Sequence, residues 1–188
     1  MREDPAAAAE RFLGLLRPLE RELEVYCRRL LFDPGDVRDA IQNAVLRALR
    51  AFDRYHEGAS FRAWLFKILT NESFALNRKR GRIAKFEVPV EAEQIESLAE
   101  SPPGAAGADW LSSWETLADA LDEEVVAALA ALTETERAVL LLRAIGGLRY
   151  REISNSLEIP LGSVMGHLHR ARQKMREAIL RSHRRSAR

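Results

Sequence analysis

Apolar residues recur every three or four positions along most of the chain, which is the spacing of the buried face of an amphipathic helix. No stretch of useful length alternates apolar and polar residues as a half-buried strand would. The pattern therefore predicts an all-α protein. The first half should contain three helices, with apolar positions at Phe12, Leu15, Leu16, Leu19, Leu23 and Tyr26, then at Val37, Ile41, Ala44 or Val45, Ala48 and Phe52, and finally at Phe61, Trp64, Leu65, Ile68 and Leu69.

Short polar segments separate these three helices. Residues 33–36 read as a turn, and Asp36 is expected to cap the second helix because its carboxylate can accept from free backbone N–H groups. Ser60 is expected to cap the third helix in the same way, and that helix should end near Gly81.

The longest stretch without helical spacing is residues 86–107, which contain Pro89, the run Pro102-Pro103-Gly104, and Gly107. Such a composition is typical of a linker. The chain has 188 residues, enough for two small helical cores. We therefore predict two small helical domains, residues 1–86 and 111–188, joined by a flexible acidic linker at residues 87–110.

The second half shows the signals of a helix-turn-helix over residues 133–181, after a helix from about residue 111 to 132. Thr133 and Glu136 have capping-box spacing, and Gly146-Gly147 should end the helix that they begin. A short helix follows from Tyr150, then a turn at residues 158–162, then a third helix that Ser163 is expected to cap. The third helix should bury Val164, Leu168, Ala171, Met175 and Ala178 and expose Met165, His169, Arg170, Arg172, Gln173 and Arg176.

Charge is unevenly distributed, although the net charge is only +1. There is no lysine or arginine between Glu87 and Glu136, whereas residues 78–85 are rich in both and residues 170–188 are rich in arginine. Two basic segments on either side of an acidic one indicate two surfaces that could bind a polyphosphate such as a nucleic acid. A basic helix of this kind fits the major groove of DNA, with its first residues towards base edges. A helical hairpin that packs on protein is the alternative.

Other classes of function have little support in the residues. The single cysteine, Cys27, lies in an apolar-periodic stretch and is expected to be a core residue. The four histidines are scattered or lie on the expected DNA face, so we expect no enzyme, no metal and no cofactor. No apolar run is long enough to cross a bilayer and no signal peptide is visible, so we expect a cytoplasmic protein without membrane insertion.

Two segments resemble a known family. Residues 132–176, LTETERAVLLLRAIGGLRYREISNSLEIPLGSVMGHLHRARQKMR, are similar to region 4 of bacterial RNA polymerase sigma factors of the sigma-70 family, in particular the extracytoplasmic-function (ECF) group. Residues 36–52 (DVRDAIQNAVLRALRAF) and 60–80 (SFRAWLFKILTNESFALNRKR) resemble region 2. The resemblance implies a sigma factor that binds the clamp and flap of core RNA polymerase, reads the −10 and −35 promoter elements and is held by an anti-sigma factor.

The same resemblance assigns roles to particular residues. By analogy the linker would thread towards the active-site and RNA-exit channels of the polymerase, and its acids suggest a DNA mimic that competes for the basic surfaces of the free protein. The expected −35 contacts are Arg149, Tyr150, Ser163, Met165, Gly166, His169, Arg170 and Arg172. The expected −10 contacts are Phe61, Trp64, Asn71, Arg78, Lys79 and Arg80, although Trp64 shares the helical face of Phe61 and Ile68 and is expected to lie mainly in the core. The expected polymerase contacts are Asp39, Gln42, Asn43, Leu46, Arg47 and Arg50.

Several positions depart from the family pattern. Asn43 stands where the family usually has glutamate, Ala75 where it has aspartate, and Glu158 where it has glycine. Because of that glycine, Glu158 is expected to need a left-handed backbone, at a cost of about 1 kcal/mol. Met165 and His167 replace the usual lysine and arginine at the start of the recognition helix, and Gly166 weakens that helix. We therefore expect either an atypical −35 sequence or weaker −35 contact.

Two other functions remain open at this point. One is a sigma-like protein that binds a regulatory partner but no longer initiates transcription. The residues expected to read single-stranded DNA favour a working factor over this alternative, namely Phe61, Trp64, Asn71 and the basic run Arg78-Lys79-Arg80. The other is a conventional helix-turn-helix regulator with an N-terminal effector domain, which leaves the region 2 resemblance unexplained.

Overall fold

The computed structural model describes residues 4–56, 60–87 and 123–186. Within those ranges every regular element is a helix, as the apolar spacing predicts, and no helix there is long and apolar enough to span a bilayer. The N-terminal unit holds four α-helices and three short 3₁₀ helices: α1 (Pro5–Leu16), η1 (Arg17–Leu19), α2 (Glu20–Leu30), η2 (Pro34–Asp36), α3 (Val37–Arg50), η3 (Phe52–Arg54) and α4 (Phe61–Glu87). The C-terminal unit holds α6 (Glu123–Ala130), α7 (Glu134–Ala144), α8 (Tyr150–Leu157) and α9 (Leu161–Ser186).

The first predicted helix is in fact two helices, so that prediction was wrong. Pro18 lies in η1, between the end of α1 at Leu16 and the start of α2 at Glu20. A proline inside a helix removes one backbone donor and its ring collides with the preceding turn. The apolar spacing continues across the break, which is why periodicity alone did not reveal it.

The start of α3 also differs from the prediction. Asp36 makes no side-chain capping bond, and Asp33 instead caps η2 by accepting from the backbone N–H of Gly35 at 2.7 Å. The Asp36 carboxylate accepts two hydrogen bonds from Arg80, at 2.9 Å from Nε and 2.8 Å from Nη2. These bonds hold the pKa of Asp36 below its ordinary value and join the start of α3 to the end of α4.

Helix α4 begins where the sequence predicts but ends later. Ser60 Oγ accepts from the backbone N–H of Ala63 at 3.2 Å, which confirms the predicted cap. The helix then continues through Gly81 to Glu87, the first residue assigned to the linker. The rest of the predicted linker, and the first part of the helix expected from residue 111, lie outside the described residues.

Aromatic rings form the core of the N-terminal unit. Phe12 packs edge-to-face on Phe52 and Phe61, with ring centroids 5.2 and 5.7 Å apart. Such pairs contribute about 0.5–1.5 kcal/mol each beyond the apolar area that they bury. Cys27 is fully buried, as expected, and burial raises the pKa of its thiol to about 12. The thiol is therefore uncharged and acts as part of the core.

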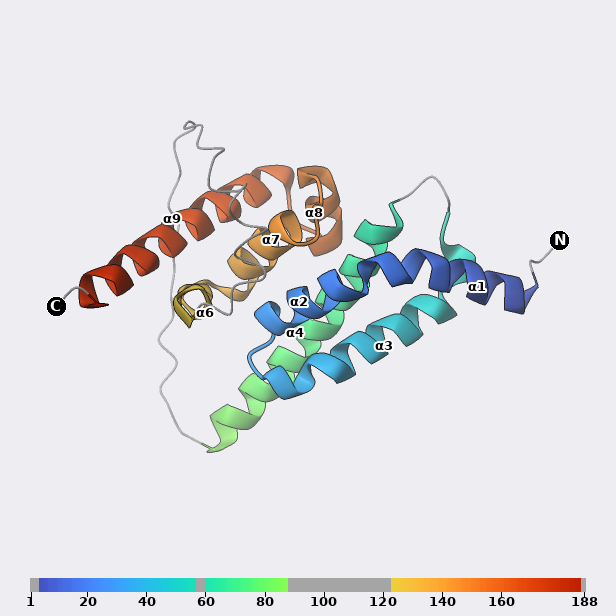
Figure 1. The fold of residues 1–188 in the computed structure, drawn as a ribbon, viewed down its shortest axis with the longest axis horizontal. Helices are drawn as coiled ribbons and strands as arrows, with labels where there is room; N and C mark the ends of the chain where they lie inside the picture. Colours follow the sequence, from blue (N-terminus) through green and yellow to red (C-terminus); the bar gives the residue numbers. More distant parts are fainter. Residues whose placement is uncertain (1–3, 57–59, 88–122, 187–188) are drawn as a thin grey trace.

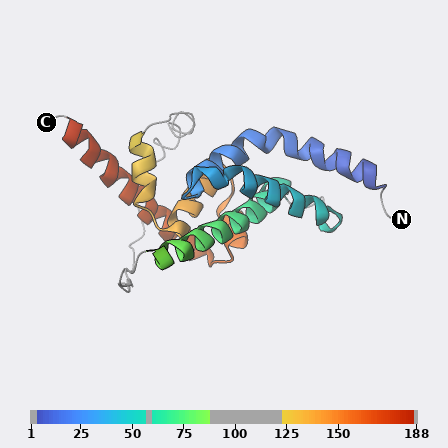
Figure 2. The same ribbon diagram turned by 90° about the horizontal axis from the view of Figure 1, so that it is seen from below.

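The two units lie against each other. Helix α4 packs on α3 of its own unit and also on α8, while α2 packs on α7. Figure 1 shows α1 and the end of α9 pointing to opposite ends of the molecule, and Figure 2 shows the same arrangement from below. The helix-turn-helix is therefore docked on the helix that carries the predicted −10 residues.

Candidate nucleic-acid interface

The capping box at the start of α7 forms as predicted. The backbone N–H of Glu136 donates to Thr133 Oγ1 at 3.3 Å, and the backbone N–H of Thr133 donates to Glu136 Oε2 at 3.0 Å. Each bond satisfies a backbone donor that the first turn of a helix leaves free. The capping box therefore fixes where the first helix of the helix-turn-helix begins.

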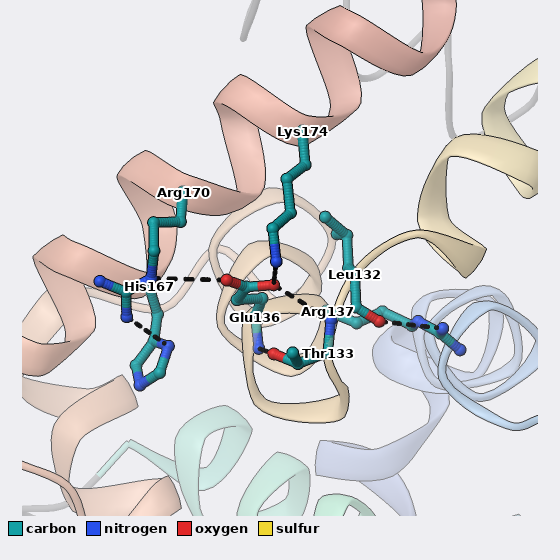
Figure 3. A network of polar contacts seen from close by, with 7 residues as sticks. All are labelled: Leu132, Thr133, Glu136, Arg137, His167, Arg170 and Lys174. Atoms are coloured by element: carbon teal, nitrogen blue, oxygen red, sulfur yellow. Dashed lines mark hydrogen bonds and ion pairs between the residues drawn. The ribbon is translucent and has the colours of Figure 1, made fainter. Parts of the chain in front are cut away.

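The carboxylate of Glu136 also joins α7 to α9. Its side chain is only 4% exposed, and it accepts from Lys174 Nζ at 2.8 Å and faces Arg170 Nε at 3.4 Å (Figure 3). Burial raises the pKa of Glu136, but the bonds from Lys174 and from the Thr133 backbone outweigh that effect and hold it below its ordinary value. A buried charge of this kind requires partners, so Glu136 fixes the position of the recognition helix α9.

Two atypical residues of α9 lie near Arg170, and one of them, His167, contacts it. Arg170 Nη2 lies 3.1 Å from His167 Nδ1 (Figure 3). A Cβ added to Gly166 would lie 3.4 Å from Arg170 Nη1, an ordinary van der Waals distance. Burial and the neighbouring guanidinium lower the pKa of His167, which favours a neutral ring that can accept at Nδ1. His167 thus helps to hold Arg170 along α9 beside Glu136.

Two left-handed residues shape the helix-turn-helix. Gly147 has φ 63°, and the predicted left-handed Glu158 has φ 56°. A residue with a side chain pays about 1–2 kcal/mol for this conformation, which glycine avoids. Around Glu158, the backbone N–H of Ile159 donates to the Ser154 carbonyl at 3.1 Å and Ser154 Oγ donates to the Ile159 carbonyl at 2.6 Å. These bonds fix the angle between α8 and α9.

Fewer side chains of α9 are exposed than were predicted to contact the −35 element. The helix begins at Leu161, so Ser163 lies inside its first turn and the prediction that it is the cap was wrong. Exposed side chains recur at Met165, His169, Gln173 and Arg176, a spacing of four, four and three that places them in one stripe. Arg170 and Arg172 are half-buried beside this stripe. Gln173 and Arg176 were not among the assigned −35 contacts, although helical spacing from His169 points to both.

The remaining predicted −35 residues lie around the stripe. Arg149 and Tyr150 are exposed at the start of α8, where the backbone N–H of Arg149 donates to Glu152 Oε2 at 2.7 Å. Ser163 and Gly166 are half-buried in the first turns of α9. The structure therefore brings the start of α8 and the start of α9 to one end of the C-terminal unit.

On α4 the predicted −10 residues divide into core and surface. Phe61 is only 7% exposed and packs in the aromatic core. Trp64 is half-buried, with its ring centroid 5.5 Å from that of Tyr55, while Asn71, Arg78 and Lys79 are exposed. Arg80 is exposed too, but its guanidinium is already bound by Asp36 and lies 2.8 Å from Asp33.

The predicted polymerase contacts share one face of α3. Asp39, Gln42, Asn43, Leu46, Arg47 and Arg50 are all exposed. A groove between α2 and α3 is lined on one side by Glu20, Glu24 and Arg28 and on the other by Arg38, Gln42 and Leu46. Arg47 also forms an ion pair with Glu72 of α4. The face combines an apolar side chain with charges of both signs, as a protein-binding surface does.

Comparison with known families gives matches to both units. Residues 15–83 match the family described as Sigma-70 region 2, and residues 122–175 match Sigma-70, region 4. The chain is 31% identical over 151 residues to the ECF RNA polymerase sigma factor SigE of Mycolicibacterium smegmatis, covering 80% of this chain but only 54% of that protein. It thus spans about half the length of that relative.

Further relatives cover more of their own length. The ECF RNA polymerase sigma-E factor of Escherichia coli K12 is 30% identical over 141 residues, covering 74% of this chain and 71% of that protein. The fold matches the sigma factor RpoE of Bartonella quintana, solved with the anti-sigma factor NepR, at a TM-score of 0.65, 24% identity and coverage of 91% of this chain and 95% of that one. CnrH, solved with the cytosolic domain of CnrY, matches at a TM-score of 0.62, 26% identity and 95% coverage of both chains. Because both units and their order agree with these relatives, the chain belongs to the ECF group of the sigma-70 family.

Proposed function

We propose that the chain is a sigma factor that binds core RNA polymerase and directs promoter-specific transcription initiation by recognising the −10 and −35 elements. One observation carries the proposal: a helix with an aromatic and basic surface and a helix-turn-helix with an exposed recognition stripe occur on one chain, in the order of the family. The chain carries out no covalent chemistry in this role. It acts in the cytoplasm, where polymerase and chromosome lie.

Helix α4 reads the −10 element as a single strand in this proposal. Unpaired bases stack on aromatic rings, and basic side chains follow the backbone. Trp64 is the partly exposed ring, and Asn71 supplies an amide. Arg78 and Lys79 contact the phosphates of the single strand. Phe61 supports the position of Trp64 from the core, with ring centroids 5.7 Å apart.

The C-terminal unit reads the −35 element. Met165 and His169 lie at the exposed beginning of α9, where base edges are met in the major groove, while Arg149 and Arg176 are placed for phosphates. Arg170 stays in the proposal as a contact whose guanidinium is held in place by Glu136 and His167. The apolar start of the stripe favours a −35 sequence in which methyl groups, rather than guanines, are recognised.

The partners follow from the remaining surfaces. The exposed face of α3 binds the polymerase clamp, and the helix-turn-helix also reaches the flap. An anti-sigma factor is a further proposed partner, supported by the two structural relatives that were solved with partners of that kind or with a cytosolic domain. We also retain the division into residues 1–86, an acidic linker at 87–110, and residues 111–188.

Reconstitution with core polymerase tests the function directly. Adding the purified chain to core polymerase and genomic DNA is expected to give transcripts that start at a limited set of sites sharing −10 and −35 motifs. The same reaction without the chain is the control. If the chain binds polymerase but yields no specific starts, it is a sigma-like regulatory protein instead.

The basic surface of α4 gives a quantitative prediction. Replacing Arg78 and Lys79 together by alanine should weaken binding of a −10 single strand and reduce the slope of log affinity against log salt by about 1.4, because each lost phosphate contact contributes about 0.7. Fluorescence anisotropy in the holoenzyme at several salt concentrations measures the slope. The matched control replaces Arg181 and Arg184, two exposed arginines of α9, and should leave that slope unchanged.

A further inference from the structure

The contact between His167 and Arg170 on α9 fixes the charge of the histidine. Arg170 Nη2 lies 3.1 Å from His167 Nδ1 (Figure 3). Arginine is not deprotonated in proteins and has no acceptor, so Arg170 donates and His167 Nδ1 accepts. The imidazole is therefore neutral in this contact, with its one proton on Nε2.

The guanidinium of Arg170 is held from two directions. Glu136 of α7 faces Nε at 3.4 Å, while His167 binds Nη2 from the preceding turn of α9. The third nitrogen, Nη1, lies on the side of Gly166, near the beginning of the helix. The side chain is 38% exposed, so a phosphate can still reach the guanidinium.

This position suits a contact with the DNA backbone. Arg170 is half-buried directly beside the exposed stripe of α9 that begins with Met165. Phosphate contacts set the position of a protein on the duplex, while the side chains of the stripe meet the base edges. A side chain that is already held loses less conformational freedom when it binds. The contacts from Glu136 and His167 therefore favour binding of Arg170 to a phosphate.

Protonation of His167 would break the contact. A proton on Nδ1 removes the acceptor and places two cations 3.1 Å apart. The other charged group that acts on the ring is Glu136 of α7, which favours the proton, but Lys174 already binds its carboxylate. Burial and Arg170 outweigh Glu136 and lower the pKa of His167 below its ordinary value of 6.5. The ring is therefore mostly neutral at pH 6.5, and the contact is lost as the pH falls further.

The charge of His167 acts mainly on Arg170 rather than on DNA. His167 is half-buried and lies outside the exposed stripe, whereas Arg170 is within hydrogen-bond distance of its ring. Coulomb energy falls with distance, so the nearer group is affected more. An arginine, which the resembled family usually has at this position, has only donors and could not accept from Arg170.

We propose that His167 is a positioning residue for −35 binding: its neutral ring holds Arg170 for the phosphate backbone, so that the −35 affinity falls when the ring takes up a proton. The inference rests on the proposed function, because Arg170 is a proposed −35 contact. It gives a role to a residue outside the set of expected −35 contacts.

The affinity of the holoenzyme for promoter DNA tests the proposal. The probe is a duplex carrying a promoter mapped by the reconstitution above, and binding is measured from about pH 5.5 to about pH 8, where histidine changes charge. His167→Ala should weaken binding about three- to tenfold at the higher pH, through loss of a hydrogen bond to a charged group. His167→Asn keeps an acceptor near the position of Nδ1 but does not titrate, so it should restore most of this loss.

The pH profile separates His167 from the other histidines. The ratio of wild-type to His167→Asn affinity should fall about three- to tenfold from the higher to the lower pH. His169 is present in both proteins, so its own titration cancels from the ratio. His183→Ala removes a histidine near the other end of α9 and is the matched control, which should keep the wild-type profile.

A double-mutant cycle separates positioning from a general structural role. In the Arg170→Ala background, His167→Ala should change the affinity by less than about twofold, because the group that His167 positions is absent. An equal loss in both backgrounds would overturn the proposal. So would a His167→Asn variant that fails to restore binding or that keeps the wild-type pH profile.

Nitrogen NMR shifts of the His167 ring in the free, full-length chain provide a readout without DNA. They should show a proton on Nε2 alone in the neutral ring, and Arg170→Ala should let the ring take up its second proton at a higher pH, because the neighbouring cation is gone. A neutral ring with its proton on Nδ1 would contradict the contact. If the proposed function fails, no specific transcript starts appear and the role in −35 binding fails with it, while the ring titration still reports whether His167 and Arg170 are paired.

Discussion

Replacing Glu136 by alanine is expected to lower the free energy of unfolding by about 2–3 kcal/mol. The substitution removes half of the capping box and leaves Lys174 and Arg170 facing α7 without their carboxylate. The side chains of Arg170 and Lys174 are 38% and 41% exposed, so water replaces part of what they lose and keeps the effect below that of a fully buried pair. Thermal and urea unfolding followed by circular dichroism measure the change. Glu177→Ala, at an exposed position of α9, is the matched control and should change little.

The same carboxylate predicts how stability depends on pH. The folded protein holds the pKa of Glu136 below its ordinary value of 4.5, so the unfolded chain binds a proton more readily. The stabilisation by Glu136 is thus fully present above pH 4.5 and is lost as the pH falls through the lower folded-state pKa. Glu136→Gln should remove this part of the acid sensitivity, whereas an unchanged pH profile would show that the network contributes nothing to stability.

Replacing Trp64 by alanine is expected to slow promoter opening about 10- to 100-fold, because base–aromatic stacking contributes about 1–3 kcal/mol per base. Permanganate reactivity of the −10 thymines over time measures opening in the holoenzyme. Trp64→Phe keeps an aromatic face and should retain most of the rate. If the Trp64→Ala variant opened the promoter at the wild-type rate, the surface that reads the −10 element would lie elsewhere on α4.

Phe61→Ala provides a comparison on the same helix that should act on stability instead. Phe61 is 7% exposed and its ring packs edge-to-face on Phe12 and Phe52. Its removal is expected to cost about 3–5 kcal/mol of unfolding free energy. If both variants impaired opening only as far as they destabilised the fold, Trp64 would be a core residue rather than a base contact.

Local patterns were sufficient where a short stretch of chain determines the outcome. Apolar spacing predicted α3, the start of α4 and the helices of the helix-turn-helix, and the capping box at Thr133 formed with both of its bonds. The left-handed conformation of Glu158 was expected from the glycine that the resembled family usually has in this turn. These features depend on neighbours within a few residues, which the sequence shows directly.

Predictions failed where a side chain bound a partner far away in the sequence, or where regular apolar spacing continued across the end of a helix. Asp36 was expected to bind its own helix, but Arg80 of α4 offers a charged donor that outcompetes a backbone N–H. The apolar pattern passed through Pro18 without change, although proline interrupts the helix there. Which residues of α9 are exposed depends on which side of α9 packs on α7. Glu136 of α7 binds Arg170 and Lys174, so these two side chains face α7.

The helical class, the helix-turn-helix and the family resemblance could all be inferred before folding was considered, because each rests on spacing and residue type along the chain. The contact of His167 with Arg170 and the contact of Glu158 with Lys67 across the two units became visible only in the folded chain. The position of a charged side chain depends on which opposite charge folding brings within about 4 Å, and that neighbour can lie anywhere in the chain.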